Sequence, residues 1–315
     1  MSLPIVILLF IVGLVLIIKG GDIFVDAASW MAEVSGIPKF IVGATVVSVA
    51  TTLPELLVSV IATLDGKVDM GIGNAVGSVT ANVGLIMAVS IICVPSVAKR
   101  SAIAFKGLLM VFSALLLWFF CSSGNLSVVQ SVILLCIFAL FVAENILSGK
   151  KAMTSNTDEK RKFTGKELVI NILKFVFGAV GIVVGADLLV DYGSELARLM
   201  GVSEAIIGVT LVAIGTSLPE FVTTITAIAK KESSLSIGNI IGANTLDLTM
   251  ILPVCSLISG GNLTVAEQSL SLDMPMSAIV CSLAVLPALA FKRFSRIQGV
   301  VIMAAYIVYL VILCT

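Results

Sequence analysis

Two short segments of the chain place a glutamate inside an apolar run beside hydroxyl-bearing residues. Glu55 lies in GATVVSVATTLPELLVS and Glu220 lies in GVTLVAIGTSLPEFVTT. On a helix, residues three, four or seven positions apart share one face. The resulting polar stripes are Ser48, Thr51, Thr52, Glu55 and Ser59 in the first segment, and Thr210, Ser217, Glu220 and Thr224 in the second. Carboxylate, hydroxyl and carbonyl oxygens are the donors that hard cations such as Ca²⁺ and Na⁺ prefer, so the stripes predict a cation site.

A proline precedes each of these glutamates. If Pro54 and Pro219 lie inside helices, each removes one backbone hydrogen bond and frees a carbonyl about one turn earlier. Freed carbonyls at membrane depth are tolerated where they line a cavity. The alternative interpretation of Glu55 and Glu220 is that they are protonated or salt-bridged acids inside the protein and bind no cation. Ionisable residues at this depth are functional by default, and here the glutamate recurs, so we favour the cation site.

A second pair of matched segments is rich in glycine and amide side chains. GIGNAVGSVTANVG and SIGNIIGANTLDLT place Asn74 opposite Asn239, and Asn82 opposite Asp247. The glycines predict close helix packing. For Asn74 and Asn239, an interhelical hydrogen bond is as good an interpretation as a role in the cation site. Asp247 is a third acid inside an apolar run, where the first half carries neutral Asn82.

The composition requires these segments to lie in a membrane. Of 315 residues, 59% are hydrophobic and 12% charged, against about 25% charged in soluble proteins. The net charge is zero, which does not suggest a nucleic-acid partner, and the absence of histidine removes the usual ligand of zinc, copper or haem. A crossing helix needs about 20 apolar residues. The predicted spans are 3–19, 40–64, 70–97, 102–121, 127–147, 167–190, 205–229, 235–258, 269–290 and 296–314.

The two halves of the chain match without a gap at an offset of 165 residues, as between Asp22 and Asp187. Each half holds five predicted spans, so the second half must enter the membrane from the opposite side. We therefore predict an all-α integral membrane protein of ten transmembrane helices, built as two inverted five-helix repeats, an architecture of secondary transporters. The predicted parts are the repeats 1–147 and 167–315, the loop 148–166 between them, and the matched site segments 40–97 and 205–258.

The distribution of Lys and Arg predicts the orientation. With the N-terminus outside, 15 basic residues, Lys106 among them, lie in cytoplasmic connections, and only Lys67 and Arg198 lie in outer ones. We expect a plasma-membrane protein with both termini outside and the central loop in the cytoplasm. The repeated acids at the polar ends of spans 1 and 6, and Glu144 near a span end, are interpreted as capping or interfacial residues. These repeated acids are Asp22, Asp26, Asp187 and Asp191.

The pattern G-x-T-x-x-x-x-x-T-[ST]-L-P-E followed by G-N-x-x-G-[SA], once in each half, resembles the alpha-repeats of sodium/calcium exchangers in the calcium/cation antiporter superfamily. The resemblance covers nearly the whole chain. It implies an antiporter, not an enzyme, that exchanges Ca²⁺ for Na⁺ by alternating access, with spans 1 and 6 sliding across a bundle that holds the site. It implies no cofactor, the lipid bilayer as surroundings, and a monomer as the functional unit.

The resemblance also implies a ligand set. Glu55 and Glu220 are the central calcium ligands, completed by the carbonyls of Thr51 and Thr216. The flanking sodium positions are lined by the hydroxyls of Thr52, Ser217 and Ser78 and the carbonyls of Ser48 and Ala213. Asn82 and Asp247 are central polar neighbours, and Asn74 and Asn239 support the site. One departure concerns sodium: Ala243 stands where the family typically has a serine, which Ser78 supplies in the first half.

Three alternatives stay open. A proton-coupled calcium exchanger is the nearest, although its relatives usually carry an acid shortly after Gly-Asn, where this chain has Ala75 and Ile240. In such an exchanger Asp247 is the acid that could carry the exchanged proton. A passive cation channel usually gains its filter from a ring of identical subunits. This chain instead carries both matched glutamate segments itself. A membrane-embedded hydrolase lacks support because no nucleophile motif or HExxH accompanies the glutamates.

Overall fold

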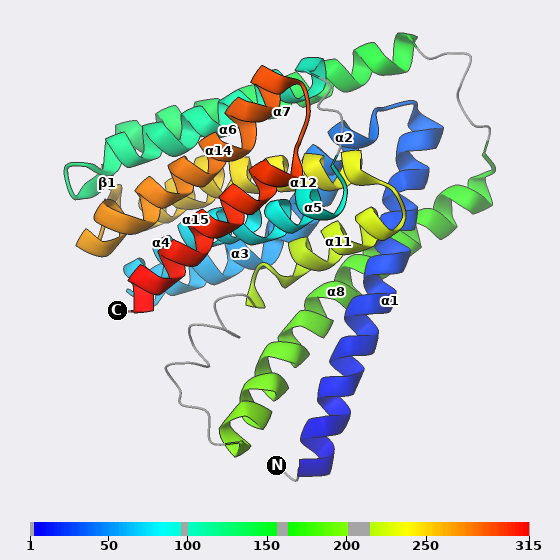
Figure 1. Cartoon of the computed structure of the whole chain (residues 1–315), viewed down its shortest axis with the longest axis horizontal. Coiled ribbons are helices and arrows are strands. Elements are labelled where there is room, and N and C mark those ends of the chain that lie inside the picture. The colour runs from blue at the N-terminus through cyan, green and yellow to red at the C-terminus, as the bar shows by residue number, and fades with distance from the viewer. Residues whose placement is uncertain (1–2, 96–99, 156–162, 201–214, 315) are drawn as a thin grey trace.

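The computed structural model describes residues 3–95, 100–155, 163–200 and 215–314 (Figure 1). These residues are almost entirely helical. The first half contains α1 (Leu3–Ser35), α2 (Lys39–Val42), η1 (Gly43–Val47), α3 (Ser48–Leu64), α4 (Val68–Ala81), η2 (Asn82–Met87), α5 (Ala88–Cys93), α6 (Arg100–Cys121), β1 (Asn125–Ser127) and α7 (Val128–Ser155). The second half contains α8 (Gly165–Leu199), α11 (Leu218–Ala229), α12 (Ser233–Leu246), η4 (Asp247–Ile251), α13 (Leu252–Ile258), β2 (Asn262–Thr264), η5 (Ser269–Asp273), α14 (Met274–Phe291) and α15 (Arg296–Cys314).

Nine helical segments in the described part of the chain are long and apolar enough to cross a membrane. They correspond to every predicted span except the seventh. Of that span the structure describes α11, a shorter apolar helix, and residues 201–214 before it lie outside the described residues. The prediction of an all-helical chain with many membrane-crossing helices is therefore confirmed for the described residues.

Two predicted boundaries were wrong. The first span was expected to end at residue 19 and the sixth at residue 190, but α1 has 33 residues and α8 has 35. Mean hydropathy falls where charged residues begin, yet the helices continue because their apolar faces stay buried, as at Phe24 and Val25 of α1. Two helices also extend into the predicted loop 148–166, because α7 continues to Ser155 and a capping box of Thr164 and Glu167 begins α8; residues 156–162 lie outside the described residues.

Helices α1 and α8 pack against each other in opposite directions (Figure 1). Gly13 lies against Gly185 and Gly20 against Gly178, so the numbering rises along one helix as it falls along the other. A Cβ atom on Gly20 would lie 2.9 Å from the Gly178 carbonyl oxygen, so only glycine allows this approach. Since the two helices are equivalent in the sequence repeat, their antiparallel packing is what an inverted repeat requires.

A second close contact joins the segment α2–η1–α3 to α12. A Cβ atom on Gly238 would overlap the carbonyl of Phe40, and one on Gly242 would lie 2.8 Å from the Ala44 carbonyl oxygen. Gly43 in turn faces the backbone of Leu235. The packing role predicted for the glycines is thus confirmed for Gly238 and Gly242 of α12, but not for their repeat equivalents Gly73 and Gly77, where an added Cβ atom would have no neighbour within 4 Å.

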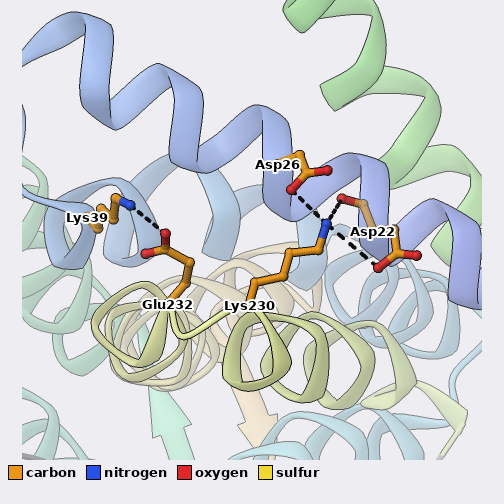
Figure 2. A network of polar contacts seen from close by, with 5 residues as sticks. All are labelled: Asp22, Asp26, Lys39, Lys230 and Glu232. Atoms are coloured by element: carbon orange, nitrogen blue, oxygen red, sulfur yellow. Dashed lines mark hydrogen bonds and ion pairs between the residues drawn. The ribbon is translucent and has the colours of Figure 1, made fainter.

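Short polar contacts join the helices at the two ends of the bundle. At one end β1 pairs antiparallel with β2, with Leu126 opposite Leu263. At the other end Lys230 contacts Asp26 at 2.6 Å and Asp22 at 3.7 Å, and Lys39 contacts Glu232 (Figure 2). Asp22 and Asp26 lie well inside α1, as Asp187 and Asp191 lie inside α8, so none of the four caps its helix. Asp22 and Asp26 form ion pairs with Lys230, and the interfacial interpretation stays a prediction.

One predicted connection residue lies inside the protein. Lys106 was assigned to a cytoplasmic connection, but it lies within α6 and is 3% exposed. Its Nζ lies 3.2 Å from a carboxylate oxygen of Glu144 and 5.4 Å from the centre of the Phe40 ring. Glu144, whose side chain is 26% exposed, is accordingly the partner of a buried cation and compensates the burial of the Lys106 charge.

Candidate cation site

Three acids from three helical segments are buried inside the bundle. Glu55 of α3 is 1% exposed, Glu220 of α11 is 0% exposed and Asp247 at the start of η4 is 1% exposed. Their carboxyl groups interact electrostatically with one another. Among the described residues none of their oxygens has a hydrogen-bond partner within 3.5 Å. Burying unpaired carboxylates costs several kcal/mol each, so the arrangement favours a positive charge between them.

Buried hydroxyl groups lie on the same helical segments as Glu55 and Glu220. Thr51 and Thr52 of α3 lie beside the carboxyl group of Glu220. Thr52 and its repeat equivalent Ser217 each carry a buried oxygen that has no hydrogen-bond partner among the described residues. Thr224 of α11 has the same property and belongs to the polar stripe of its segment. Uncharged oxygens of this kind are donors that hard cations accept.

The two repeated asparagines connect the glutamate helices to their neighbours. Asn74 of α4 donates from Nδ2 to the backbone carbonyl of Glu55 (3.2 Å) and to Ser59 Oγ (2.9 Å). Asn239 of α12 donates from Nδ2 to Thr223 Oγ1 (3.1 Å) and accepts from Thr51 Oγ1 (3.3 Å). The interhelical hydrogen bonds considered for this pair are present, and they hold α3 and α11 in place around the acids.

Asn82 and Asp247 occupy equivalent irregularities of their helices. Asn82 is the first residue of the π-helical segment η2, and Asp247 is the first residue of η4. Both side chains are 1% exposed. A π-helical turn widens the backbone locally and occurs often at functional sites. The repeat therefore reproduces a backbone feature as well as a sequence motif.

The two prolines are not equivalent in the structure. Pro54 lies inside α3, as predicted, whereas Pro219 lies in the first turn of α11, after Thr216 and Ser217. The prediction of a helix-interior proline in span 7 was therefore wrong for α11, the part of that span that the structure describes. A first-turn proline is favourable because its missing N–H is not needed there.

The remaining predicted residues have simple positions. Ser78 on α4 is 4% exposed, and Ala243 on α12 is fully buried. Ser48 donates from Oγ to the Thr45 carbonyl (3.1 Å), and its own carbonyl accepts from Thr51 Oγ1 at 3.4 Å. Ala213 lies outside the described residues.

Within the described residues, no three His, Cys, Asp or Glu side chains converge closely enough to hold a metal ion by themselves. A cation between Glu55, Glu220 and Asp247 must therefore also use hydroxyl or carbonyl oxygens. Hard cations commonly take such mixed oxygen ligands.

The repeat comparison missed one buried amide beside this cluster. Asn244 of α12 is fully buried and accepts from Asn82 Nδ2 at 3.1 Å. Its equivalent at the repeat offset is Val79, so a search for matched polar residues passes over it. The signal available in the sequence was its position three residues before Asp247, on the same helix face.

Oppositely oriented helical halves that enclose unpaired acids define a secondary cation antiporter. The chain belongs to the sodium/calcium exchanger family, because the model of the sodium/calcium exchanger protein family matches residues 5–147 and 170–315. This membership confirms the predicted family. It also confirms the prediction that the chain is a multi-pass transport protein and not an enzyme.

Relatives and solved structures agree with this assignment. The sodium/calcium exchanger MaX1 of Methanosarcina acetivorans is 30% identical over 97% of each chain. The inner membrane protein YrbG of Escherichia coli is 30% identical, over 97% of this chain and 95% of that one. A structure of the sodium-calcium exchanger NCX_Mj soaked with Na⁺ and Sr²⁺ superposes with a TM-score of 0.84 at 28% identity, over 98% of both chains.

Proposed function

We propose that this chain exchanges Ca²⁺ for Na⁺ by alternating access at the cluster of Glu55, Glu220 and Asp247. The observation that carries the proposal is the burial of these acids without hydrogen-bond partners among the described residues. The two glutamate carboxylates together balance the charge of one Ca²⁺, which carboxylate oxygens bind well.

The proposed ligands follow from the surroundings of the acids. Glu55 and Glu220 bind Ca²⁺ together with the carbonyls of Thr51 and Thr216. Thr52, Ser217 and Ser78 supply hydroxyls for sodium, and Asn82 and Asp247 complete the centre. Asn74 and Asn239 act by holding the helices, as their hydrogen bonds support. Ser48 and Ala213 are proposed carbonyl ligands on the sodium side.

Sodium as the counter-ion draws support from the relatives named for sodium/calcium exchange. Ala243 provides no hydroxyl where Ser78 provides one in the other half, so we expect one sodium position to be weaker. A proton-coupled exchange that uses Asp247 is the second candidate, because that acid also lacks a hydrogen-bond partner in the described part of the chain.

The moving part in this proposal is the pair α1 and α8. The two helices pack closely on each other and extend away from the rest of the bundle (Figure 1). Lys230 ties α1 to the connection between α11 and α12 through Asp22 and Asp26 (Figure 2). We propose that this contact is on the cytoplasmic side and breaks when the pair slides. The positive-inside pattern supports both termini outside the plasma membrane, and one chain supplies both halves of the site, which supports a monomer in the lipid bilayer.

Radioactive calcium uptake into proteoliposomes tests the proposal. Vesicles loaded with Na⁺ and diluted into Na⁺-free buffer should accumulate Ca²⁺, and vesicles without a sodium gradient should not. Uptake that follows a pH gradient and ignores sodium would replace Na⁺ with H⁺. Flux that needs no counter-ion would instead indicate a channel.

A further inference from the structure

Asn82 is held by a neighbour that belongs to the other half of the chain. Its Nδ2 donates to Oδ1 of Asn244 at 3.1 Å, and both side chains are at most 1% exposed. Asn82 begins η2, whereas Asn244 lies on α12 one turn before Asp247. The hydrogen bond therefore crosses between the two repeats beside the acids.

A third residue fixes the direction of this hydrogen bond. Asn244 donates from Nδ2 to Sδ of Met110 on α6 at 3.7 Å. A thioether sulfur accepts hydrogen bonds and has no hydrogen to donate. Asn244 must therefore turn its nitrogen toward Met110 and its oxygen toward Asn82. Asn82 consequently donates its nitrogen to Asn244.

The oxygen of Asn82 is left over by this arrangement. Asn82 Oδ1 is buried and has no hydrogen-bond partner among the described residues, as is also true of the oxygens of Asp247. An amide presents an oxygen to a cation in only one of its two orientations, whereas a carboxylate presents an oxygen in both. Asn82 thus needs a residue that orients it, and Asp247 does not.

The repeat carries the same distinction. The position equivalent to Asn244 is Val79, and the position equivalent to Asn82 is Asp247. The half that supplies a carboxylate therefore has an apolar residue where the half that supplies an amide is served by Asn244. We propose that Asn244 is a positioning residue that turns the Asn82 oxygen toward the transported cation. The proposal rests on the proposed function of the site.

Equilibrium binding of radioactive Ca²⁺ to the purified full-length protein tests this inference. Asn244→Leu should weaken binding about tenfold, and Met110→Leu, which keeps the volume and removes the acceptor, should weaken it about threefold. In an Asn82→Ala background both substitutions should have no further effect on Ca²⁺ binding, because the oxygen that Asn244 orients is already absent. This comparison is a double-mutant cycle, which isolates the coupling between the two residues. Asn145→Leu, which removes a buried amide that bonds to the Phe141 carbonyl, is the matched control and should leave binding unchanged.

Two results would overturn the inference. The first is unchanged Ca²⁺ affinity in both Asn244→Leu and Met110→Leu. The second is an equal loss of affinity with and without Asn82, which would indicate a general packing effect. Glu55→Gln separates the inference from the proposed function: if this variant binds Ca²⁺ as the wild type does, the site itself is wrong and the positioning role falls with it.

Discussion

Thr51 of α3 donates a hydrogen bond of 3.3 Å to the side-chain oxygen of Asn239 on α12. The amide nitrogen of the same asparagine donates to Thr223 of α11 at 3.1 Å. One side chain thus joins both helices that carry the central glutamates. All three side chains are buried, so water does not compete with these bonds.

Removing this link should loosen the site. Asn239→Leu leaves Thr51 and Thr223 without their interhelical partner, and a lost buried hydrogen bond costs about 1–3 kcal/mol. We expect the apparent affinity for Ca²⁺ to fall about tenfold in a vesicle uptake assay. Asn171→Leu, which removes an amide that bonds within α8 to the Glu167 carbonyl, serves as the control. Unchanged affinity in Asn239→Leu would contradict the supporting role.

Restoring the missing hydroxyl should strengthen sodium binding. Ala243→Ser adds an oxygen at a fully buried position of α12. Since a hydrogen bond or ligand to a charged group contributes about 1.5–3 kcal/mol, the Na⁺ concentration that half-inhibits Ca²⁺ uptake should fall at least about tenfold. Ser78→Ala should move it in the opposite direction. No change in either variant would show that sodium does not use these positions.

The close contact of α1 and α8 should tolerate no side chain at Gly20. The Cβ atom of Gly20→Ala would lie 2.9 Å from the backbone of Gly178 and Ile182, so the helices must separate. Overpacking of this kind costs about 1–3 kcal/mol. We expect lower thermal stability in detergent and slower exchange. Gly149→Ala, whose Cβ atom would meet Ile37 at a comfortable 3.8 Å, should have neither effect.

The ion pairs of Lys230 should affect transport more than stability. Its partners Asp22 and Asp26 are partly exposed, and such pairs contribute about 0–1 kcal/mol. Lys230→Met should leave the melting temperature nearly unchanged and should alter the exchange rate up to about fivefold. Lys231→Met removes the same charge from the next residue and should not alter the rate. Equal effects of the two substitutions would point to net charge and not to the ion pairs.

Much of the fold could be predicted because a lipid environment leaves few choices. Apolar runs must form helices, and the ungapped match of Glu55 with Glu220 identified the central acids. Charges were harder to place. Lys106 looked like a connection residue because the sequence does not show that Glu144 and Phe40 lie beside it.

The limits of the site prediction have a similar physical origin. A repeat reveals residues that recur, so it found Asn74 and Asn239 but passed over Asn244, whose partner Asn82 lies 162 residues away in the chain. The different positions of Pro54 and Pro219 in their helices also depend on tertiary packing. The two matching motifs do not reveal this difference.

The central claim is that the buried carboxylates of Glu55 and Glu220 bind the exchanged ions. Sodium-driven Ca²⁺ uptake into proteoliposomes by Glu55→Gln and Glu220→Gln tests it most directly, with Glu267→Gln at an exposed position as the control. The account predicts background uptake in the first two variants and wild-type uptake in the control. Wild-type uptake in either Glu55→Gln or Glu220→Gln would contradict it.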